Sequence, residues 1–314
     1  MPSLSSADHR VSPPAVFMPR DYNAAHDLIE RNLAAGRAGK LAYIDDAGRY
    51  SYAELGERVN RAANALTGLG LAMEERVLLC HLDTVDWPAV FLGAIKAGIV
   101  PVAANTLLTA SDYEFMLRDS RAGTLIVSEA LYTTFAPLLG KLPLLRNVIV
   151  SGQDAKGQLH LQGLMQKAGT AFEPAPTTRD DACFWLYSSG STGKPKGTVH
   201  VHSSLIYTAE LYARPVLGIR ENDLVFSAAK LFFAYGLGNG LTFPLSVGAT
   251  TVLMAERPTP QAVFKRLTGL RPTVFYGVPT LYAGLLASSE LPKKDDVAMR
   301  ICTSAGEALP ADIG

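Results

Sequence analysis

The sequence predicts an α/β protein with mixed, mostly parallel sheets flanked by helices in layered subdomains. Short apolar runs typical of buried strands alternate with segments of helical period through both halves of the chain, as in right-handed strand–helix–strand crossovers. Hydrophobic residues make up 48% and charged residues 18% of the 314 residues, which is typical of a globular protein. This length suffices for one large domain or two ordinary ones with a full core.

The first half of the chain carries two clear helix starts. Ser51 and Glu54 fit a capping box, and the apolar residues that follow at helical spacing predict a helix that Gly70 ends. Ser111 and Glu114 fit a second capping box, which predicts a helix to about residue 120. The other elements expected in this half are a helix at 85–97 and strands at 77–80, 99–103, 124–127 and 148–150.

The second half repeats the alternation of strands and helices. Residues 151–180 are more polar and are predicted to link two subdomains. We expect a loose arm over residues 1–20, a first α/β subdomain over 21–175 and a second over 176–314, which breaks off where such a unit normally continues. The elements expected in the second half are strands at 224–227, 250–253, 273–276 and 300–303, and helices near 203–213, 260–270 and 280–287.

Charge and cysteine content argue against several partners and compartments. The formal net charge of +0 provides no basic field for nucleic acid or an anionic membrane. Cys80, Cys183 and Cys302 are scattered and form no CxxC pair, which indicates reduced thiols in a cytoplasmic protein. The most apolar run, at 87–104, contains two prolines and a lysine, so we interpret it as a buried helix and a buried strand rather than a membrane span.

The segment from Ser188 to Gly197 (SSGSTGKPKG) is the strongest functional signal in the sequence. It combines free backbone N–H groups, short hydroxyl donors and the lysines Lys194 and Lys196. Such groups hold a polyphosphate. A flexible surface connection is the competing interpretation, but Pro195 stiffens the segment and the lysines charge it.

Two common nucleotide motifs do not fit the chain. The P-loop pattern fails because Gly190 and Gly193 are too close together and Pro195 stands where a Ser or Thr would bind magnesium. The glycine cluster at 236–240 is not a dinucleotide fingerprint, because Leu241 occupies the last glycine position. A tight turn into a helix is the simpler interpretation of that cluster.

The string from Tyr187 to His200 resembles the signature loop of the adenylate-forming superfamily, which includes acyl- and aryl-CoA synthetases, peptide adenylation domains and luciferases. Within that superfamily, KLFFAYGLGNG at 230–240 resembles the benzoate–CoA ligases. Phe233 stands where many relatives carry a histidine, so no role for that histidine is carried over. Other strings that resemble superfamily motifs, in order from about residue 25 onward, are SYAEL at 51–55, LGAIKAGIVPV at 92–102, GVPT at 277–280 and SAGEALP at 304–310.

The resemblance implies a two-step ligase reaction that uses ATP, Mg²⁺ and coenzyme A. A carboxylate attacks the α-phosphorus of ATP to give an acyl-adenylate and pyrophosphate, and the coenzyme A thiol then displaces AMP to leave a thioester. The first step joins two anions, so the site must neutralise charge and align the attack. Benzoate is the implied acid, because no residue in the pocket strings demands a charged ring substituent.

The resemblance also assigns nucleotide and metal residues. The signature loop would wrap the β- and γ-phosphates, with Thr192 also close to magnesium. Lys196 would add charge, and Lys194 is a weaker candidate. The segment that begins at Ser304 would lie against the adenine, although an ordinary strand-to-loop turn is the alternative. The expected ATP-binding residues are Ser188, Ser189, Gly190, Ser191, Thr192, Gly193, Lys196, Ser304, Ala305, Gly306 and Glu307.

An aromatic pocket for the acid is expected, by the same resemblance, around the string KLFFAYG. Phe233, Ala234, Tyr235 and Gly236 would line it, with Tyr276 as another wall. Aromatic walls beside small residues suit a flat ring that enters edge-on. Plain core packing is the alternative for these aromatic residues.

His200 and His202 follow the signature loop, but we interpret both as structural. A carboxylate is already ionised at neutral pH, so the first step needs no general base. Superfamily members carry a magnesium-binding Glu, a ribose-binding Asp and a catalytic Lys in later motifs, none of which occurs before Gly314. We therefore expect the catalytic Lys to lie beyond residue 314, in a C-terminal domain absent here, and this chain alone to form the adenylate poorly.

Other functions stay open at this point. One is a ligase for another aryl acid or a fatty acid. Another is a non-catalytic nucleotide- or ligand-binding module that keeps the loop without the later motifs. The expected partners are the small-molecule carboxylic acid, ATP and coenzyme A, with no nucleic acid and no membrane. A homodimer is compatible with the sequence.

Overall fold

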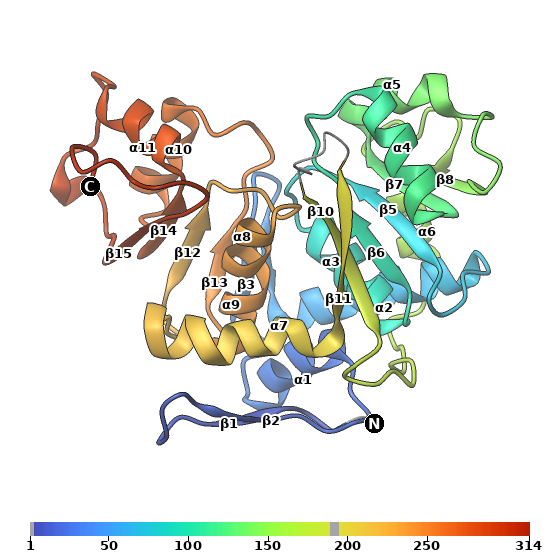
Figure 1. Ribbon diagram of the computed structural model, residues 1–314, viewed down its shortest axis with the longest axis horizontal. Coiled ribbons are helices and arrows are strands. Elements are labelled where there is room, and N and C mark those ends of the chain that lie inside the picture. The colour runs from blue at the N-terminus through green and yellow to red at the C-terminus, as the bar shows by residue number, and fades with distance from the viewer. Residues whose placement is uncertain (1–2, 189–194) are drawn as a thin grey trace.

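The computed structural model describes residues 3–188 and 195–314, and most of its strands belong to one of two large sheets (Figure 1). The first sheet contains β5 (Arg76–Cys80), β6 (Val100–Ala103), β7 (Thr124–Ser128), β8 (Asn147–Ser151), β9 (Leu159–His160), β10 (Ala182–Ser188) and β11 (Lys196–Val201). The second contains β3 (Leu41–Ile44), β4 (Arg49–Ser51), β12 (Leu224–Ser227), β13 (Thr250–Val252), β14 (Val274–Gly277) and β15 (Ile301–Ser304).

Both sheets are mostly parallel, as the sequence predicts. The strand orders are β11-β10-β6-β5-β7-β8-β9 and β15-β14-β12-β13-β3-β4. Among the described residues, only the pairs β10–β11 and β3–β4 are antiparallel within these sheets. We call the first sheet with its helices the first lobe, and the second sheet with its helices the second lobe.

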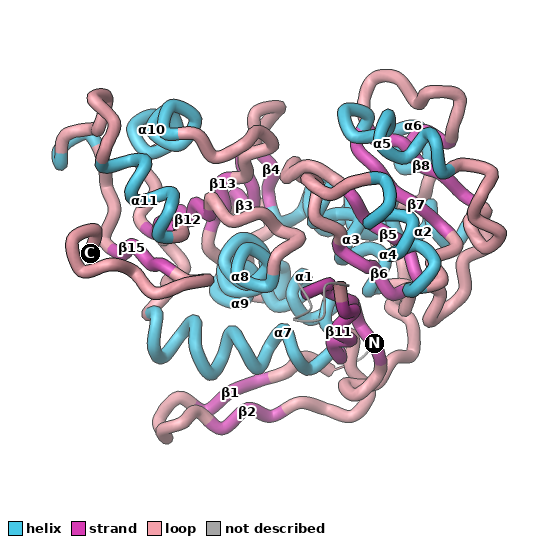
Figure 2. The backbone as a smooth tube through the Cα atoms, turned by 45° about the horizontal axis from the view of Figure 1, so that its top comes forward, coloured by secondary structure: helices cyan, strands magenta, loops and turns pink. Residues whose placement is uncertain are grey.

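Helices cover both faces of each sheet (Figure 2). In the first lobe they are α1 (Ala24–Ala34), α2 (Tyr52–Gly68), α3 (Asp86–Lys96) and α6 (Leu161–Lys167) on one face, and α4 (Ala110–Ser120) and α5 (Tyr132–Phe135) on the other. In the second lobe they are α7 (His202–Thr208), α8 (Ala234–Leu237), α9 (Phe243–Val247) and the π-helical segments η3 (Ala209–Leu217) and η4 (Gly238–Thr242), with α10 (Pro260–Gly269) and α11 (Pro279–Leu286) on the opposite face.

Strand alternation decides which core each side chain of the second sheet joins. Val274 and Tyr276 point toward η3 and α9, whereas Phe226 and Phe275 point toward α10 and α11. Successive side chains of a strand point to opposite faces, so a strand buried on both faces is apolar at nearly every position. The site residue Tyr276 is thereby fixed on the α9 side of the sheet.

The predicted elements are largely confirmed, with the start of one helix corrected. The Ser51–Glu54 capping box is present at α2. At α4 the capping box is instead formed by Thr109 and Asp112, because the helix begins two residues earlier than the Ser111–Glu114 pattern suggests. The apolar run at 87–104 forms most of α3 and then β6, as expected, and no helix in the described part of the chain is long and apolar enough to cross a membrane.

Residues 3–20 are not a loose arm. The strands β1 (Ser6–Asp8) and β2 (Ala15–Phe17) form a hairpin that lies alongside α7 in both views (Figures 1 and 2). His9 Nε2 lies 2.7 Å from a carboxylate oxygen of the buried Glu210 in η3. Asp27, also buried, accepts a hydrogen bond from the backbone N–H of Ser5. The buried carboxylates of Glu210 and Asp27 hold this segment in place. Its Ser- and Pro-rich composition gives no indication of these contacts.

The segment at 151–180 is more than a linker, and the boundary between the lobes is not a single point in the sequence. β9 joins the first sheet and α6 packs on α2, so this polar stretch completes the first lobe. β10 and β11 extend the same sheet, whereas the early strands β3 and β4 belong to the second. The sheets therefore do not divide the chain between residues 175 and 176, and the proposed division into subdomains stays a prediction.

Candidate active site

The residues expected to bind substrates lie beyond the carboxyl ends of parallel strands. Ser188 ends β10, which runs parallel to β6, and Gly277 and Ser304 end neighbouring strands of the second sheet. The segment at 228–236 follows β12 in that sheet. In open α/β sheets ligands bind outside the carboxyl ends of the strands, so this edge is the natural place for a site.

The signature loop joins two paired strands of the first sheet. Ser188 and Lys196 are exposed and face each other in the β10–β11 register. Tyr187 anchors this end of the hairpin, because its hydroxyl donates a 2.6 Å hydrogen bond to Asp119 of α4. A side chain at Gly197 would approach the ring of Trp185 to 3.0 Å, which explains the glycine there. The expected residues Ser189, Gly190, Ser191, Thr192 and Gly193 lie outside the described residues.

Two tyrosines and the end of β15 come together in the second lobe. The rings of Tyr235 and Tyr276 meet edge to face, with 6.2 Å between centroids and 87° between planes. Tyr235 Oη lies 2.6 Å from Thr303 Oγ1. The hydroxyl of Tyr276 is buried and has no hydrogen-bond partner among the described residues, and the same holds for the Ser304 hydroxyl and the Asn239 amide nitrogen. Unpaired buried polar groups beside an aromatic pair are unusual and mark this cluster as a ligand site candidate.

The segment expected to contact adenine starts at this cluster. Ser304 continues from Thr303, and Tyr282 of α11 donates a 2.8 Å hydrogen bond to the Thr303 carbonyl. Gly306 has a φ of +96°, a conformation that favours glycine, and together with Glu307 it is exposed. The structure thus brings the proposed adenine segment next to Tyr235 and Tyr276.

Gly236 is required by a close backbone approach. A side chain on this residue would come within 2.0 Å of the carbonyl oxygen of Lys230. The same carbonyl accepts a 3.0 Å hydrogen bond from the N–H of Phe233, so residues 230–236 fold into a compact turn. Ala234 is exposed at this turn and Tyr235 is half-buried. The pocket string is therefore a defined turn that ends in α8.

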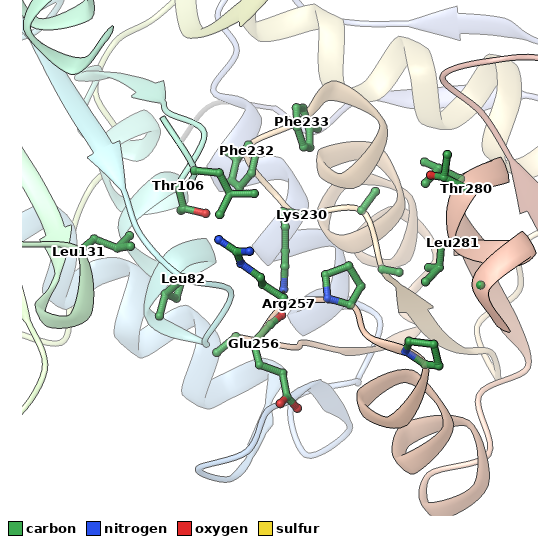
Figure 3. Close-up of a pocket in the computed structure, with 18 residues that line it drawn as sticks. Leu82, Thr106, Leu131, Lys230, Phe232, Phe233, Glu256, Arg257, Thr280 and Leu281 are labelled. Carbon is green, nitrogen blue, oxygen red and sulfur yellow. Dashed lines mark hydrogen bonds between the residues drawn. The ribbon is translucent and has the colours of Figure 1, made fainter. Parts of the chain in front are cut away.

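Phe233 borders a cavity whose described lining does not include the tyrosine pair. It lines a cavity of about 750 Å³ between the lobes, and the described lining does not include Ala234, Tyr235, Gly236 or Tyr276. Figure 3 shows Phe232 and Phe233 on one side of this cavity, Thr280 and Leu281 on the α11 side, and the side chains of Lys230 and Arg257 between them. The lining from the first lobe is Leu82, Thr106, Leu107 and Leu131.

Two charged residues of this region have very different surroundings. Lys230 donates hydrogen bonds to the carbonyls of Met254 and Glu256, and burial lowers the pKa of its ammonium. The guanidinium of Arg257 makes no hydrogen bond or ion pair with any described residue. The cavity therefore combines apolar walls with one unengaged positive charge.

Asp83 of the first lobe is buried against the pocket turn. Its carboxylate accepts a hydrogen bond from the N–H of Leu231, at 3.2 Å from Oδ2 and 3.4 Å from Oδ1. Burial raises the pKa of Asp83 to about 7, although the nearby Lys230 and the Leu231 N–H both favour the ionised form. No local motif in the sequence points to this residue, and only the contact across the lobes reveals it.

The two histidines after the loop have structural surroundings. The Nδ1 atom of His202 accepts a 3.1 Å hydrogen bond from the N–H of Ala24 at the start of α1, and burial lowers the pKa of His202 to about 4. The ring of His200 stacks on Phe184 at 4.6 Å. Neither contact directs an imidazole at a substrate, which agrees with the structural interpretation.

The expected metal residue is not open to a structural test. Thr192 lies outside the described residues, and within the described ranges no three or more His, Cys, Asp or Glu side chains group as a metal site.

The fold and site correspond to a known enzyme family. Residues 30–314 match the family model "AMP-binding enzyme", and the chain belongs to this family. It is 63% identical over 315 aligned residues to a benzoate–CoA ligase of Thauera aromatica, an alignment that covers 100% of this chain. It is 47% identical over 300 residues, 94% of the chain, to a 4-hydroxybenzoate–CoA/benzoate–CoA ligase of Rhodopseudomonas palustris.

Solved structures agree with this assignment. A benzoate CoA ligase from Burkholderia xenovorans LB400 superposes with a TM-score of 0.87 and 57% identity, covering 93% of this chain and 57% of that one. An anthranilate CoA ligase in complex with anthranoyl-AMP superposes with a TM-score of 0.91 and 38% identity, covering 94% and 57%. The chain spans 59% and 55% of the two curated relatives, so it corresponds to a little over half of their length.

Proposed function

We propose that the protein carrying this chain activates benzoate with ATP and transfers the acyl group to coenzyme A. The observation that carries the proposal is the Tyr235–Tyr276 ring pair, which lies directly beside the expected adenine segment at Ser304. A flat acid held against these rings has its carboxylate near the nucleotide. The 63% identity to a benzoate–CoA ligase over the whole chain supports the same acid.

In the first step a carboxylate oxygen of the acid bonds to the α-phosphorus of ATP while the bond to pyrophosphate breaks. The acid arrives ionised, so the site need only align the two anions and offset their charge. We assign the charge-offsetting role to Lys196 and to the hydroxyl and N–H donors of the signature loop at 188–193. Ser304, Ala305, Gly306 and Glu307 are assigned to the adenine. Mg²⁺ would supply further positive charge near Thr192.

In the second step the coenzyme A sulfur bonds to the acyl carbon, the bond to AMP breaks, and the thiol proton is released. We assign the approach of the thiol to the cavity of about 750 Å³ beside Phe233. Its apolar walls suit a narrow, flexible arm, and the free guanidinium of Arg257 suits a phosphate. We therefore assign Phe233 to the entrance for the thiol and not, as the sequence suggested, to the acid pocket.

The test compares acids in an assay of acid-dependent AMP release by the protein that carries this chain. Benzoate is expected to exceed hexanoate by at least tenfold in kcat/KM. Replacing Ala234 by Leu narrows the acid pocket, so ring-substituted benzoates should lose more activity than benzoate. Equal losses for benzoate and hexanoate would contradict the placement of Ala234, and no AMP release with any acid would end the proposal.

Hydroxybenzoates are a second candidate substrate class, because the buried Tyr276 hydroxyl lacks a partner among the described residues. A ring hydroxyl that reaches it would restore a hydrogen bond worth about 1 kcal/mol. The same assay with 4-hydroxybenzoate separates the two acids. Cytoplasmic location and homodimer formation stay predictions from the sequence.

A further inference from the structure

We propose that Asp83 of the first lobe is a positioning residue for the acid pocket of the second lobe. Its carboxylate holds the backbone at Leu231 and thereby sets where Tyr235 stands against Tyr276 and Thr303. The inference rests on the proposed function, since it names a residue that prepares the same pocket. No sequence motif includes Asp83, which lies 148 residues from Leu231.

Asp83 is itself held in a rigid part of the first lobe, just after β5. Within its own segment, the N–H of Leu82 donates to the hydroxyl of Ser128, and the N–H of Thr84 donates to the Leu82 carbonyl. One residue further on, the N–H of Val85 donates to the carboxylate of Asp45. The bonds to Ser128 and Asp45 tie this segment to the ends of β7 and β3, so the carboxylate is presented from a fixed base.

A short series of backbone contacts makes the position of Tyr235 depend on the position of Leu231. The neighbouring carbonyl of Lys230 accepts the N–H of Phe233, and the backbone of Gly236 packs directly on that carbonyl. α8 starts within this turn, where the N–H of Leu237 donates a 2.7 Å hydrogen bond to the Phe233 carbonyl. A shift of residues 230–231 therefore displaces the whole turn, including Tyr235, because Gly236 leaves no free space.

The contact between Asp83 and Leu231 joins the two lobes at their interface. Asp83 is 5% exposed, and within the described residues Leu231 is its hydrogen-bond partner. The charged and titratable groups that face the carboxylate are Lys230 of the turn and Tyr43 of β3. The ammonium of Lys230 donates hydrogen bonds to the Met254 and Glu256 carbonyls, so these bonds hold the same turn from the second lobe. Asp83 supplies the matching restraint from the first lobe.

The test uses the full chain with Asp83→Ala, which removes the acceptor, and Asp83→Asn, which keeps an oxygen at the same place without the charge. Hydrogen exchange is measured by mass spectrometry on peptides that cover 229–237, with peptides from α3 as an internal reference. We expect exchange at 229–237 to rise about tenfold in Asp83→Ala, the size of one lost hydrogen bond to a charged acceptor, and to stay within about threefold of wild type in Asp83→Asn.

Kinetics then separate positioning from simple destabilisation in the protein that carries this chain. In Asp83→Ala the KM for the acid should rise about tenfold while the KM for ATP stays within about twofold, and Asp83→Asn should restore the acid KM. Asp83→Glu keeps the charge and displaces the carboxylate by one methylene, so it should raise the acid KM even if Asp83→Ala folds poorly. Equal exchange in wild type and Asp83→Ala, or an Asp83→Asn variant as impaired as Asp83→Ala, would overturn the proposal. A wild-type protein without acid-dependent AMP release would instead reject the proposed function, because the exchange experiment does not depend on activity.

Discussion

Tyr235 and Thr303, which are 68 residues apart in the sequence, place their hydroxyl oxygens 2.6 Å apart. This contact joins the first turn of α8 to the end of β15, and so it joins the proposed acid pocket to the proposed adenine segment. Tyr282 donates to the backbone carbonyl of the same threonine from α11. The end of β15 is thus held by two phenols, of which only Tyr235 also faces Tyr276.

Replacing Tyr235 by Phe should impair the acid more than the nucleotide. The change removes the hydrogen bond to Thr303 but keeps the ring, so we expect a stability loss of about 1 kcal/mol and a several-fold rise in the KM for benzoate. Tyr282→Phe is the matched control, because it removes a hydrogen bond to the same residue away from the ring pair. If both variants raise the benzoate KM equally, Tyr235 has no special place in the pocket.

Gly236→Ala should destabilise the protein strongly. The added Cβ would meet the Lys230 carbonyl oxygen at 2.0 Å, and backbone on both sides must move to relieve the clash. We expect a loss of about 3 kcal/mol or more in urea unfolding. Gly269→Ala at the end of α10 meets nothing within 4 Å and should be neutral or stabilising by up to about 1 kcal/mol. A Gly236→Ala protein as stable as Gly269→Ala would show that the turn is not compact.

His202 should make stability depend on pH below neutrality. Burial lowers the pKa of His202 to about 4, below the unfolded value of about 6.5, so the folded state binds fewer protons between these values. Its contribution is complete above pH 6.5 and is lost as the pH falls toward 4. His202→Asn removes the titration and keeps an acceptor near the Ala24 N–H.

We therefore expect wild type to lose about 2 kcal/mol more than His202→Asn between pH 7 and pH 5 in urea unfolding, because 1.5 pH units lie below the unfolded pKa. Other titrating groups, including Asp83, are common to both proteins and cancel in the difference. Identical pH dependence of the two proteins would contradict the buried, neutral state of His202. A selective change in the pH profile of adenylate formation would contradict its structural role.

Arg257→Ala should weaken coenzyme A and leave the first step intact. The guanidinium lies in the cavity assigned to the thiol and has no partner among the described residues, so its loss leaves no protein group unpaired. We expect the KM for coenzyme A to rise about tenfold, and ATP–pyrophosphate exchange with benzoate to remain within about twofold. Arg271→Ala is a control outside the described lining of this cavity, because its guanidinium donates to the Asp295 carbonyl. If ATP–pyrophosphate exchange fell as much as the affinity for coenzyme A, the assignment of this cavity to the thiol would be wrong.

Local patterns predicted most of the sheet strands and the longer helices. The capping box at Ser51 and the apolar runs in β5, β7 and β12 are short-range signals, and short-range energetics decide those elements. The polar stretch at 151–180 was expected to be a linker, because β9 and α6 are short and their stability comes from packing on the first lobe. The β1–β2 hairpin was missed for the same reason, because its strands are short and it is held by contacts with residues far along the chain.

The residues of the candidate site likewise fall into those that a local sequence pattern predicted and those that it did not. The glycine turn with Tyr235 and the strand ends with Tyr276 and Ser304 are contiguous strings, and the structure places them together. Asp83 and Arg257 carry no local pattern, since each acquires its surroundings from segments distant in the sequence. Phe233 belongs to a recognisable string, yet its ring turns toward the cavity, because the direction of one side chain in a tight turn depends on backbone geometry that composition does not encode.

The exchange of strands between the lobes has a consequence for how the polypeptide acquires its structure during synthesis. In the first sheet β10 and β11 are synthesised long after β5 to β8, and in the second sheet β3 lacks its partner β13 until the far half of the chain has been made. The edge of nascent β3 that later pairs with β13 thus stays unpaired for many seconds at ordinary elongation rates. Chaperone demand during translation should accordingly peak before residue 250 and fall once β13 pairs with β3.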